Sequence, residues 1–168
     1  MDEKSEIVYA FIDANNLYME TSKNGGWLVD YLKLRIWLYR KFNVSVAYMF
    51  IGKKEGSEYK SLYSYLESCG FELVFKPTIP DANGKTKGNI DSDLVLKAMI
   101  EFPNYDKAII ISNDGDFYSL VRYLRENGKL KYVISPGKKH LSVLLKKEAG
   151  KHIILLEQAR NLLEYKKK

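Results

Sequence analysis

Acidic side chains gather at three points along this sequence. Asp13 directly follows the apolar run 7–12, and Asp114 closely follows the apolar run 107–112. Asp91 precedes a segment with helical periodicity. In an open parallel sheet, ligands bind beyond the carboxyl ends of the strands, so these carboxylates are expected to meet there. Clustered carboxylates repel one another, and a divalent cation is the usual way to hold them together. The pattern therefore predicts a metal site.

The same acids also have a structural explanation. Aspartate is a favoured N-cap residue, and acidic residues are favoured in the first turn of a helix. Asp13 can cap the helix that follows it, and either Asp114 or Asp116 can cap the next one and leave the other for a metal. Asp91 and Asp93 share this ambiguity, with Asp91 the stronger candidate. Capping accounts for one polar residue at a strand end but not for several together.

The elements that must position these residues follow from hydrophobic periodicity. Near-continuous apolar runs are typical of strands buried on both faces, and helical stripes separate most of them. This alternation predicts a three-layer α/β/α sandwich with a mainly parallel central sheet and right-handed crossovers. The predicted strands are 7–12, 44–51, 71–75, 107–112, 131–135 and 152–154. The predicted helices are 30–42, 58–69, 91–102, 116–127, 139–147 and 155–165.

Length and composition limit the class of protein. A chain of 168 residues with 46% hydrophobic and 29% charged residues fits one globular domain, 1–168. The single cysteine, Cys69, excludes an internal disulfide and a zinc site of several thiolates. The charged start of the chain lacks the apolar stretch of a signal peptide, and no apolar run is long enough for a membrane helix. We therefore expect a cytoplasmic protein that does not bind membranes.

Basic residues suggest a polyanionic partner. The formal net charge is +6, and an excess of lysine and arginine favours binding to phosphates. Several lysines follow predicted strands or lie in the irregular stretch 76–89, which we expect to be a mobile flap beside the acids. The candidate phosphate-binding residues are Lys53, Lys54, Lys85, Lys87, Lys138 and Lys139. Three aromatic residues are candidates for stacking on bases: Tyr18, Trp27 and Tyr118.

Three segments together resemble the signature blocks of NYN domains, which are PIN-like nuclease domains of the LabA-like group. The segments are Phe11-Ile12-Asp13-Ala14-Asn15-Asn16-Leu17, Lys87-Gly88-Asn89-Ile90-Asp91-Ser92-Asp93-Leu94 and Ile111-Ser112-Asn113-Asp114-Gly115-Asp116-Phe117. They occur in the order and spacing of that family, and the resemblance spans residues 7 to about 135.

This resemblance implies a PIN-like fold, Mg²⁺ or Mn²⁺ as the cofactor, and RNA as the substrate. It implies that the catalytic and metal-binding acids are Asp13, Asp91, Asp114 and Asp116, with Asn16, Ser112 and Asp93 supporting them. The sequence departs from the family pattern at three places. Lys97 stands where many members have another acid, Asn113 replaces a glycine, and the segment around Gly150 lacks a common aspartate.

Two functional hypotheses remain open at this point. The first is a metal-dependent ribonuclease, in which water activated by a divalent cation hydrolyses the phosphodiester bond without a Ser, Cys or His nucleophile. The second is a PIN-like domain that binds RNA or a protein partner without efficient cleavage, which the departures at Lys97 and Gly150 favour. A homodimer is compatible with either. A haloacid-dehalogenase-like phosphotransferase fits less well, because Asn15 stands where that family needs a second aspartate.

Overall fold

Six strands form one sheet in the computed structural model, which describes residues 5–77, 79–80, 82–83, 86–87 and 90–167. The strand order is β3-β2-β1-β6-β7-β8, and every neighbouring pair is parallel. The strands are β1 (Val8–Asp13), β2 (Val44–Lys53), β3 (Phe71–Pro77), β6 (Lys107–Ile111), β7 (Leu130–Ser135) and β8 (Ile153–Leu155). The predicted parallel sheet is confirmed.

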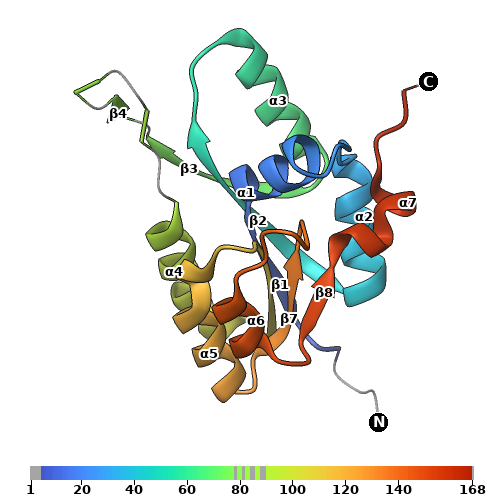
Figure 1. Ribbon diagram of the computed structural model, residues 1–168, viewed down its shortest axis with the longest axis vertical. Helices are drawn as coiled ribbons and strands as arrows, with labels where there is room; N and C mark the ends of the chain where they lie inside the picture. Colours follow the sequence, from blue (N-terminus) through green and yellow to red (C-terminus); the bar gives the residue numbers. More distant parts are fainter. Residues whose placement is uncertain (1–4, 78, 81, 84–85, 88–89, 168) are drawn as a thin grey trace.

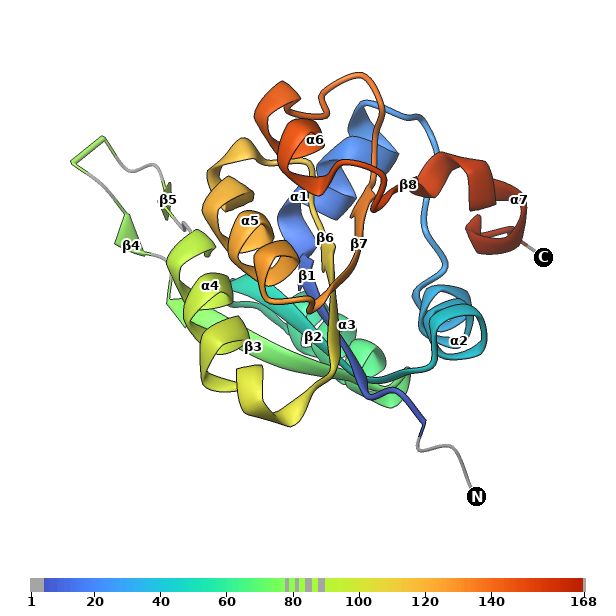
Figure 2. The ribbon, with the colours of Figure 1, turned by 90° about the horizontal axis from the view of Figure 1, so that it is seen from below.

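Helices cover both faces of this sheet (Figures 1 and 2). One layer contains α1 (Ala14–Tyr18), α2 (Tyr31–Phe42), α3 (Ser57–Ser68) and α7 (Arg160–Leu163), and the other contains α4 (Asp91–Ile100), α5 (Tyr118–Glu126) and α6 (Val143–Ala149). The central strands alternate accordingly, since Ile12 packs in the core on the first face and Phe11 in the core on the second. The molecule is thus the predicted α/β/α sandwich.

The strand order determines where a ligand can bind. From β1 the chain winds outward to β2 and β3, and after β3 it returns to β6 and winds outward in the opposite direction to β7 and β8. The reversal lies between β1 and β6, which pair in register from Val8 with Lys107 to Ile12 with Ile111. In doubly wound sheets the crevice for ligands lies beyond the carboxyl ends of the strands at this point. Asp13 is the last residue of β1, and Asp114 closely follows β6.

Local signals explain several helix boundaries. The Asp30 carboxylate caps α2 by accepting a hydrogen bond from the Lys33 backbone amide (3.1 Å), and Asn43 ends the helix in the left-handed region with φ of 59°. The Ser142 hydroxyl caps α6 by accepting from the Leu145 amide (3.3 Å). This cap explains why α6 begins at Val143 rather than at residue 139 as predicted.

The structure differs from the predicted elements in other places. The predicted helices did not include α1, although Asp13 was considered as a cap for a helix at this place, or the π-helical turn η1 (Met19–Lys23) that continues it. The predicted helix 155–165 is a 3-10 turn (Leu156–Ala159) followed by the short α7, and two further 3-10 turns occur at Phe102–Asn104 and Gly115–Phe117. Within the predicted flap 76–89, β3 extends to Pro77 and a two-stranded hairpin forms from β4 (Ile79–Pro80) and β5 (Thr86–Lys87). Across the described ranges, no helix has the length and apolar character that crossing a bilayer requires.

Candidate metal centre

Three carboxylates from three separate elements meet at the switch point of the sheet. One oxygen from each of Asp13, Asp91 and Asp114 lies within 4.8 Å of the other two. Asp13 ends β1, Asp91 is the first residue of α4, and Asp114 follows β6. The sheet register and the start of α4 therefore bring together residues that are far apart in the sequence.

Two of these acids are helix caps as well as members of the cluster. Asp13 Oδ1 accepts a hydrogen bond from the Asn16 amide at 3.2 Å, and Asp114 Oδ1 accepts one from the Asp116 amide at 2.9 Å. The structural and the chemical explanations of the sequence pattern are therefore compatible. Each cap engages one carboxylate oxygen in a backbone hydrogen bond and does not involve the other.

The surroundings of the cluster disfavour negative charge. Burial raises the pKa of Asp13 from its usual 3.8 to about 6, and the charge of Asp114 contributes further, against hydrogen bonds from Asn16 and Ser112 that lower it. Burial also raises the pKa of Asp91 to about 6, with the nearby charges of Asp114, Asp13 and Asp116 adding to the shift. Bringing such acids together has an electrostatic cost, which a cation would offset.

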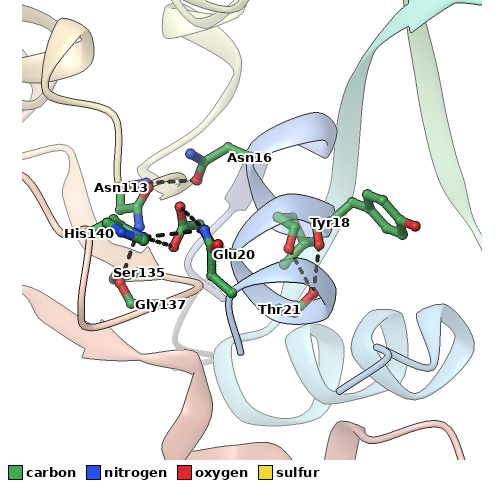
Figure 3. Close-up of polar contacts among 10 residues, drawn as sticks. Asn16, Tyr18, Glu20, Thr21, Asn113, Ser135, Gly137 and His140 are labelled. Carbon is green, nitrogen blue, oxygen red and sulfur yellow. Dashed lines mark hydrogen bonds and ion pairs between the residues drawn. The ribbon is translucent and has the colours of Figure 1, made fainter. Parts of the chain in front are cut away.

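A hydrogen-bond network connects the elements that carry the cluster. The Ser112 hydroxyl lies 3.4 Å from Asp13 Oδ2 as a donor and accepts from the Asp114 amide at 3.1 Å. Asn16 Oδ1 accepts from the Asn113 amide at 3.1 Å, so α1 is linked to the segment that follows β6 (Figure 3). Ser112 and Asn113 are both buried. Two of the three predicted supporting residues, Asn16 and Ser112, thus contact the loop or the carboxylates of the cluster.

The other two predicted acids lie at different distances from this centre. Asp116 is exposed, lines the same cavity as the cluster and interacts with Asp91, but it does not belong to the group of three mutually close carboxylates. Asp93 occupies the first turn of α4 and does not line the cavity. The structure thus separates an inner group of three acids from Asp116 at its rim.

A cavity of about 880 Å³ extends from the acids toward α3. The acids line one part of it, and side chains from α1, α2, β2 and α3 line the rest. Of the predicted phosphate-binding lysines, Lys54 lines this cavity, whereas Lys53 places its Nζ 5.8 Å from the centre of the Phe75 ring. Lys138 and Lys139 are exposed in the segment between β7 and α6 and do not line it. Lys85 lies outside the described residues, and only the backbone of Lys87, in β5, is described.

The positions that depart from the family pattern have structural roles. Lys97 Nζ lies 3.2 Å from the Glu101 carboxylate and 5.0 Å from the centre of the Tyr48 ring, outside the cavity. Asn113 Nδ2 donates to the Gly137 carbonyl at 3.1 Å, which joins the segments after β6 and β7. Gly150 ends α6 with φ of 59°, a conformation that glycine adopts without strain.

Sequence reasoning missed a second polar cluster beside the centre. Glu20 in the π-helical turn is buried, and its Oε2 lies 3.0 Å from His140 Nδ1, while its Oε1 accepts from Asn24 at 3.1 Å (Figure 3). A Cβ added to Gly137 would lie 2.8 Å from Glu20 Oε2, so the glycine permits this close approach. The carboxylate thus holds the segment after β7 against η1. No signal in the sequence marked Glu20, because it lies in a π-helical turn that the hydrophobic pattern does not reveal.

The candidate stacking residues differ in their accessibility. Tyr18 lines the cavity, is 47% exposed and points away from the Glu20–His140 cluster (Figure 3). Tyr118 is 36% exposed but lies beside Arg122 rather than in the cavity. The prediction for Trp27 is wrong, because this side chain is 3% exposed and packs in the core beneath the Arg160 guanidinium. A buried ring cannot stack on a base.

Comparison with known proteins identifies the family. The sequence model of the NYN domain family matches residues 8–157 of this chain, and this range includes all three members of the acid cluster. The chain belongs to the NYN domain family. This NYN domain is 26% identical over 123 residues to the Low amplitude and bright protein LabA of Synechococcus elongatus. The alignment covers 68% of this chain and 66% of LabA, so the NYN domain described here spans just under two thirds of that relative.

A solved structure supports the fold of this NYN domain. This NYN domain resembles the crystal structure of a protein of unknown function from Vibrio parahaemolyticus, with a TM-score of 0.83 and 22% sequence identity. The similarity covers 98% of this chain and 99% of the other. At this identity the likeness establishes the shared architecture, and the chemistry must be argued from the residues.

The donor set of this NYN domain suits a hard divalent cation. Mg²⁺ and ions of similar chemistry prefer oxygen ligands at about 2.1 Å, so two ligands on opposite sides of the ion lie about 4.2 Å apart. Only one pair among three ligands can lie on opposite sides, so the oxygens of Asp13, Asp91 and Asp114, which lie within 4.8 Å of one another, would have to draw closer together around one ion. The three clustered donors are all carboxylate oxygens, so the three aspartates could hold Mg²⁺ or a similar ion.

Proposed function

We propose that this NYN domain is a metal-dependent ribonuclease. The observation that carries the proposal is the convergence of Asp13, Asp91 and Asp114 from three elements at the switch point of the sheet, within a family of nuclease-like domains. The cavity beside them is large enough for part of a nucleotide as well as an ion. The formal net charge of +6 favours a polyanionic substrate.

Each group of residues at the site has a separate role in this proposal. Asp13, Asp91 and Asp114 hold Mg²⁺ or Mn²⁺, and Ser112 and Asn16 keep the cluster in place through their hydrogen bonds. When bound, the ion lowers the pKa of water and neutralises charge on the phosphate. Asp116, exposed at the rim, orients the water and accepts its proton. Lys54 attracts the phosphate backbone into the cavity.

The lining of the cavity favours direct attack by water. Hydrolysis adds water across a P–O bond, and enzymes that form a covalent intermediate use a Ser, Cys, Thr, Lys, Asp, Glu, His or Tyr nucleophile. Of these types the described lining contains only Asp, Lys and Tyr, and the scheme gives Lys54 the attraction of the phosphate backbone and the tyrosines no bond to phosphorus. The acids are already committed to an ion or to water in this scheme, so no covalent step is needed.

A second candidate function is RNA binding without efficient cleavage. The observation that favours it is Lys97, which stands in α4 where many related domains carry another acid and which pairs with Glu101 instead. With three close carboxylates rather than a larger set, the centre suits one ion better than two. A single ion binds the phosphate but stabilises the attacking and leaving oxygens less symmetrically than a pair.

A cleavage assay with purified protein tests the proposal. Single-stranded RNA should be cleaved in Mn²⁺ or Mg²⁺ and remain intact in EDTA. The Asp91→Asn variant, prepared identically, controls for contaminating nuclease because it removes one carboxylate of the cluster without changing the size of the side chain. Binding without cleavage by the wild type would support the second function. Equal cleavage by both proteins would contradict the proposed centre.

A further inference from the structure

The cavity beside the acids is too large for an ion and its waters alone. Its volume is about 880 Å³, whereas one water occupies about 30 Å³ in the liquid. We give the name tyrosine arm to the part of its lining formed by Tyr18, Tyr31, Tyr59, Leu62, Tyr63 and Lys54. The acids and the tyrosine arm are two parts of one continuous space.

The tyrosine arm presents aromatic and aliphatic surface that protein atoms leave partly open. Leu62 is 42% exposed and Tyr18 47% exposed, and Tyr59 and Tyr63 are half-buried. On α3 itself only Leu66 is buried, although the helix covers β2 and β3. A helix that leaves a tyrosine-rich side open toward a cavity is suited to contact a flat, partly apolar ligand.

Contacts within the protein hold the aromatic rings in place. Tyr63 packs edge-on against Phe75 with ring centres 4.8 Å apart, and its hydroxyl accepts a hydrogen bond from the Lys54 amide at 3.0 Å. The Tyr59 ring lies 6.4 Å from that of Tyr63 and 5.6 Å from Lys54 Nζ. Because these partners already fix the rings, a ligand that stacks on them loses little affinity to side-chain ordering.

The charges of the cavity indicate which ligand fits both parts. The acid end suits a cation and, through it, a phosphate, while the tyrosine arm carries no acid among its defining residues. Lys54, the sole cation among the described lining residues, belongs to the arm and can contact a second phosphate or the edge of a ring. A nucleotide has this combination of an anionic end and a flat aromatic end.

We propose that the tyrosine arm binds one unpaired nucleobase of the RNA whose backbone phosphate lies at the acid cluster. This inference rests on the proposed function for the source of the phosphate. Bases in a duplex are stacked and paired, so only an unpaired base can enter the arm. The tyrosine faces read the base by stacking, which every base can do, so the site selects exposed nucleotides rather than a particular sequence.

The test compares two ligands that differ only in their bases. A six-nucleotide oligouridylate and its abasic counterpart carry the same phosphates, and their dissociation constants are measured in Ca²⁺, a hard cation that carboxylates bind, with each oligonucleotide checked to be intact after the titration. For the wild type the abasic ligand should bind more weakly by between about 5- and 150-fold, the range for one stacked base. The Tyr59→Ala/Tyr63→Ala variant should lose this preference and bind both ligands alike.

Three further variants keep the test decisive. Leu62→Glu changes a partly exposed residue and should fold. The new carboxylate repels the phosphates of both ligands equally, so that repulsion does not change the ratio of their affinities. The ratio should fall because a charged side chain replaces an apolar contact with the base. Tyr63→Phe keeps the ring and should retain the preference. Tyr39→Ala removes a tyrosine that is 60% exposed on α2 outside this cavity and should behave as the wild type.

The outcomes separate this inference from the proposed function. If the wild type prefers the base-bearing ligand and the double variant does not, the base site is supported even if no RNA is cleaved in Mn²⁺. If the wild type cleaves RNA but shows the same affinity for both ligands, the base site is overturned and the nuclease stands. A preference that survives both the double variant and Leu62→Glu also overturns it, because the base then binds elsewhere.

Discussion

Asp13 combines two roles in one residue. One carboxylate oxygen caps α1 through the Asn16 amide, and the other lies near the Ser112 hydroxyl in the acid cluster. A residue selected only as a cap would be equally well served by asparagine, because Asp and Asn rank together at N-caps. Substitution by asparagine therefore separates the two roles.

We predict that Asp13→Asn and Asp114→Asn each reduce RNA cleavage in Mn²⁺ by orders of magnitude, because a neutral amide is a poorer ligand for the ion. In EDTA both variants should be at least as stable as the wild type. For Asp13, whose pKa is raised to about 6 by burial, the gain at neutral pH should be about 1–3 kcal/mol. Thermal melts in EDTA and cleavage assays in Mn²⁺ measure the two effects.

Glu126→Gln is the matched control for these variants. It also removes one negative charge, but from an exposed position at the end of α5 and outside the cavity. Its cleavage rate and melting temperature should equal those of the wild type. Unchanged cleavage in Asp13→Asn would mean that this acid is only a cap.

At the scale of elements, the loops that follow the parallel strands place different lysines at different distances from the centre. Lys54 follows β2 and lines the cavity, whereas Lys138 and Lys139 follow β7 and do not. We predict that Lys54→Ala weakens binding of single-stranded RNA more than either Lys138→Ala or Lys139→Ala. The slope of log K against log salt should become shallower by about 0.7 for each phosphate that the variant no longer neutralises.

Titrations at several salt concentrations measure these slopes. If Lys138→Ala or Lys139→Ala has the larger effect, the RNA backbone crosses the segment between β7 and α6 instead of the tyrosine arm. This comparison also tests whether the Glu20–His140 contact, which holds that segment against η1, lies beside the RNA path.

The contact between α5 and α6 gives the fold a dependence on acid. Glu148 on α6 accepts hydrogen bonds from Arg122 at 2.7 Å and from Arg125 at 3.1 Å, both on α5. These bonds lower the pKa of Glu148 from 4.5 to about 2, with the bond from Arg122 the largest cause. The ionised form is therefore favoured in the folded state, so its contribution to stability is complete above pH 4.5 and is lost as the pH falls toward 2.

We predict that Glu148→Gln lowers the melting temperature at pH 7 and that the difference from the wild type shrinks as the pH falls toward 2. Below its folded pKa the wild-type side chain is protonated and resembles glutamine. Melts of both proteins across this range measure the effect. A difference that is constant with pH would show that Glu148 acts by packing rather than by charge.

At the scale of the whole molecule, sheet and helices were predictable because their signals are local and repetitive. Runs such as 107–112 are apolar on both faces, and the stripe of Leu34 and Leu38 on α2 has helical spacing. The short α1 was missed because five residues give no period to recognise. The start of α6 depended on a Ser142 cap that competes with several other polar residues nearby.

The candidate site was predictable only in part. Asp13 and Asp114 follow apolar strands, so their meeting required only that these strands be neighbours, which β1 and β6 are. The separation of Asp116 from the inner group depends on the 3-10 turn Gly115–Phe117, which the sequence did not indicate. Of the tyrosine arm, only Tyr18 was among the candidates, because thirteen tyrosines in the chain made the choice among them arbitrary, and only packing shows which of them line a cavity.

We predict that Mn²⁺ stabilises the whole fold through the acid cluster. An ion that binds only the folded state at 100 times its dissociation constant adds about 2.7 kcal/mol to the free energy of unfolding. For a chain of this size the melting temperature should rise by about 5–10 °C. Thermal melts with and without Mn²⁺ measure the shift, and Asp13→Asn should abolish most of it. An equal shift in that variant would place the ion elsewhere.

The pairing of β1 with β6 has a consequence for the order in which the protein becomes active. Asp13 is synthesised early, but Asp114 follows a strand that is made after β2, β3 and α4, and it reaches the cluster only once that strand pairs with β1. A nascent chain still held by the ribosome at residue 90 therefore carries one acid of the three. If the domain is a ribonuclease as proposed, its own messenger RNA is beside it throughout this interval and meets only an incomplete centre.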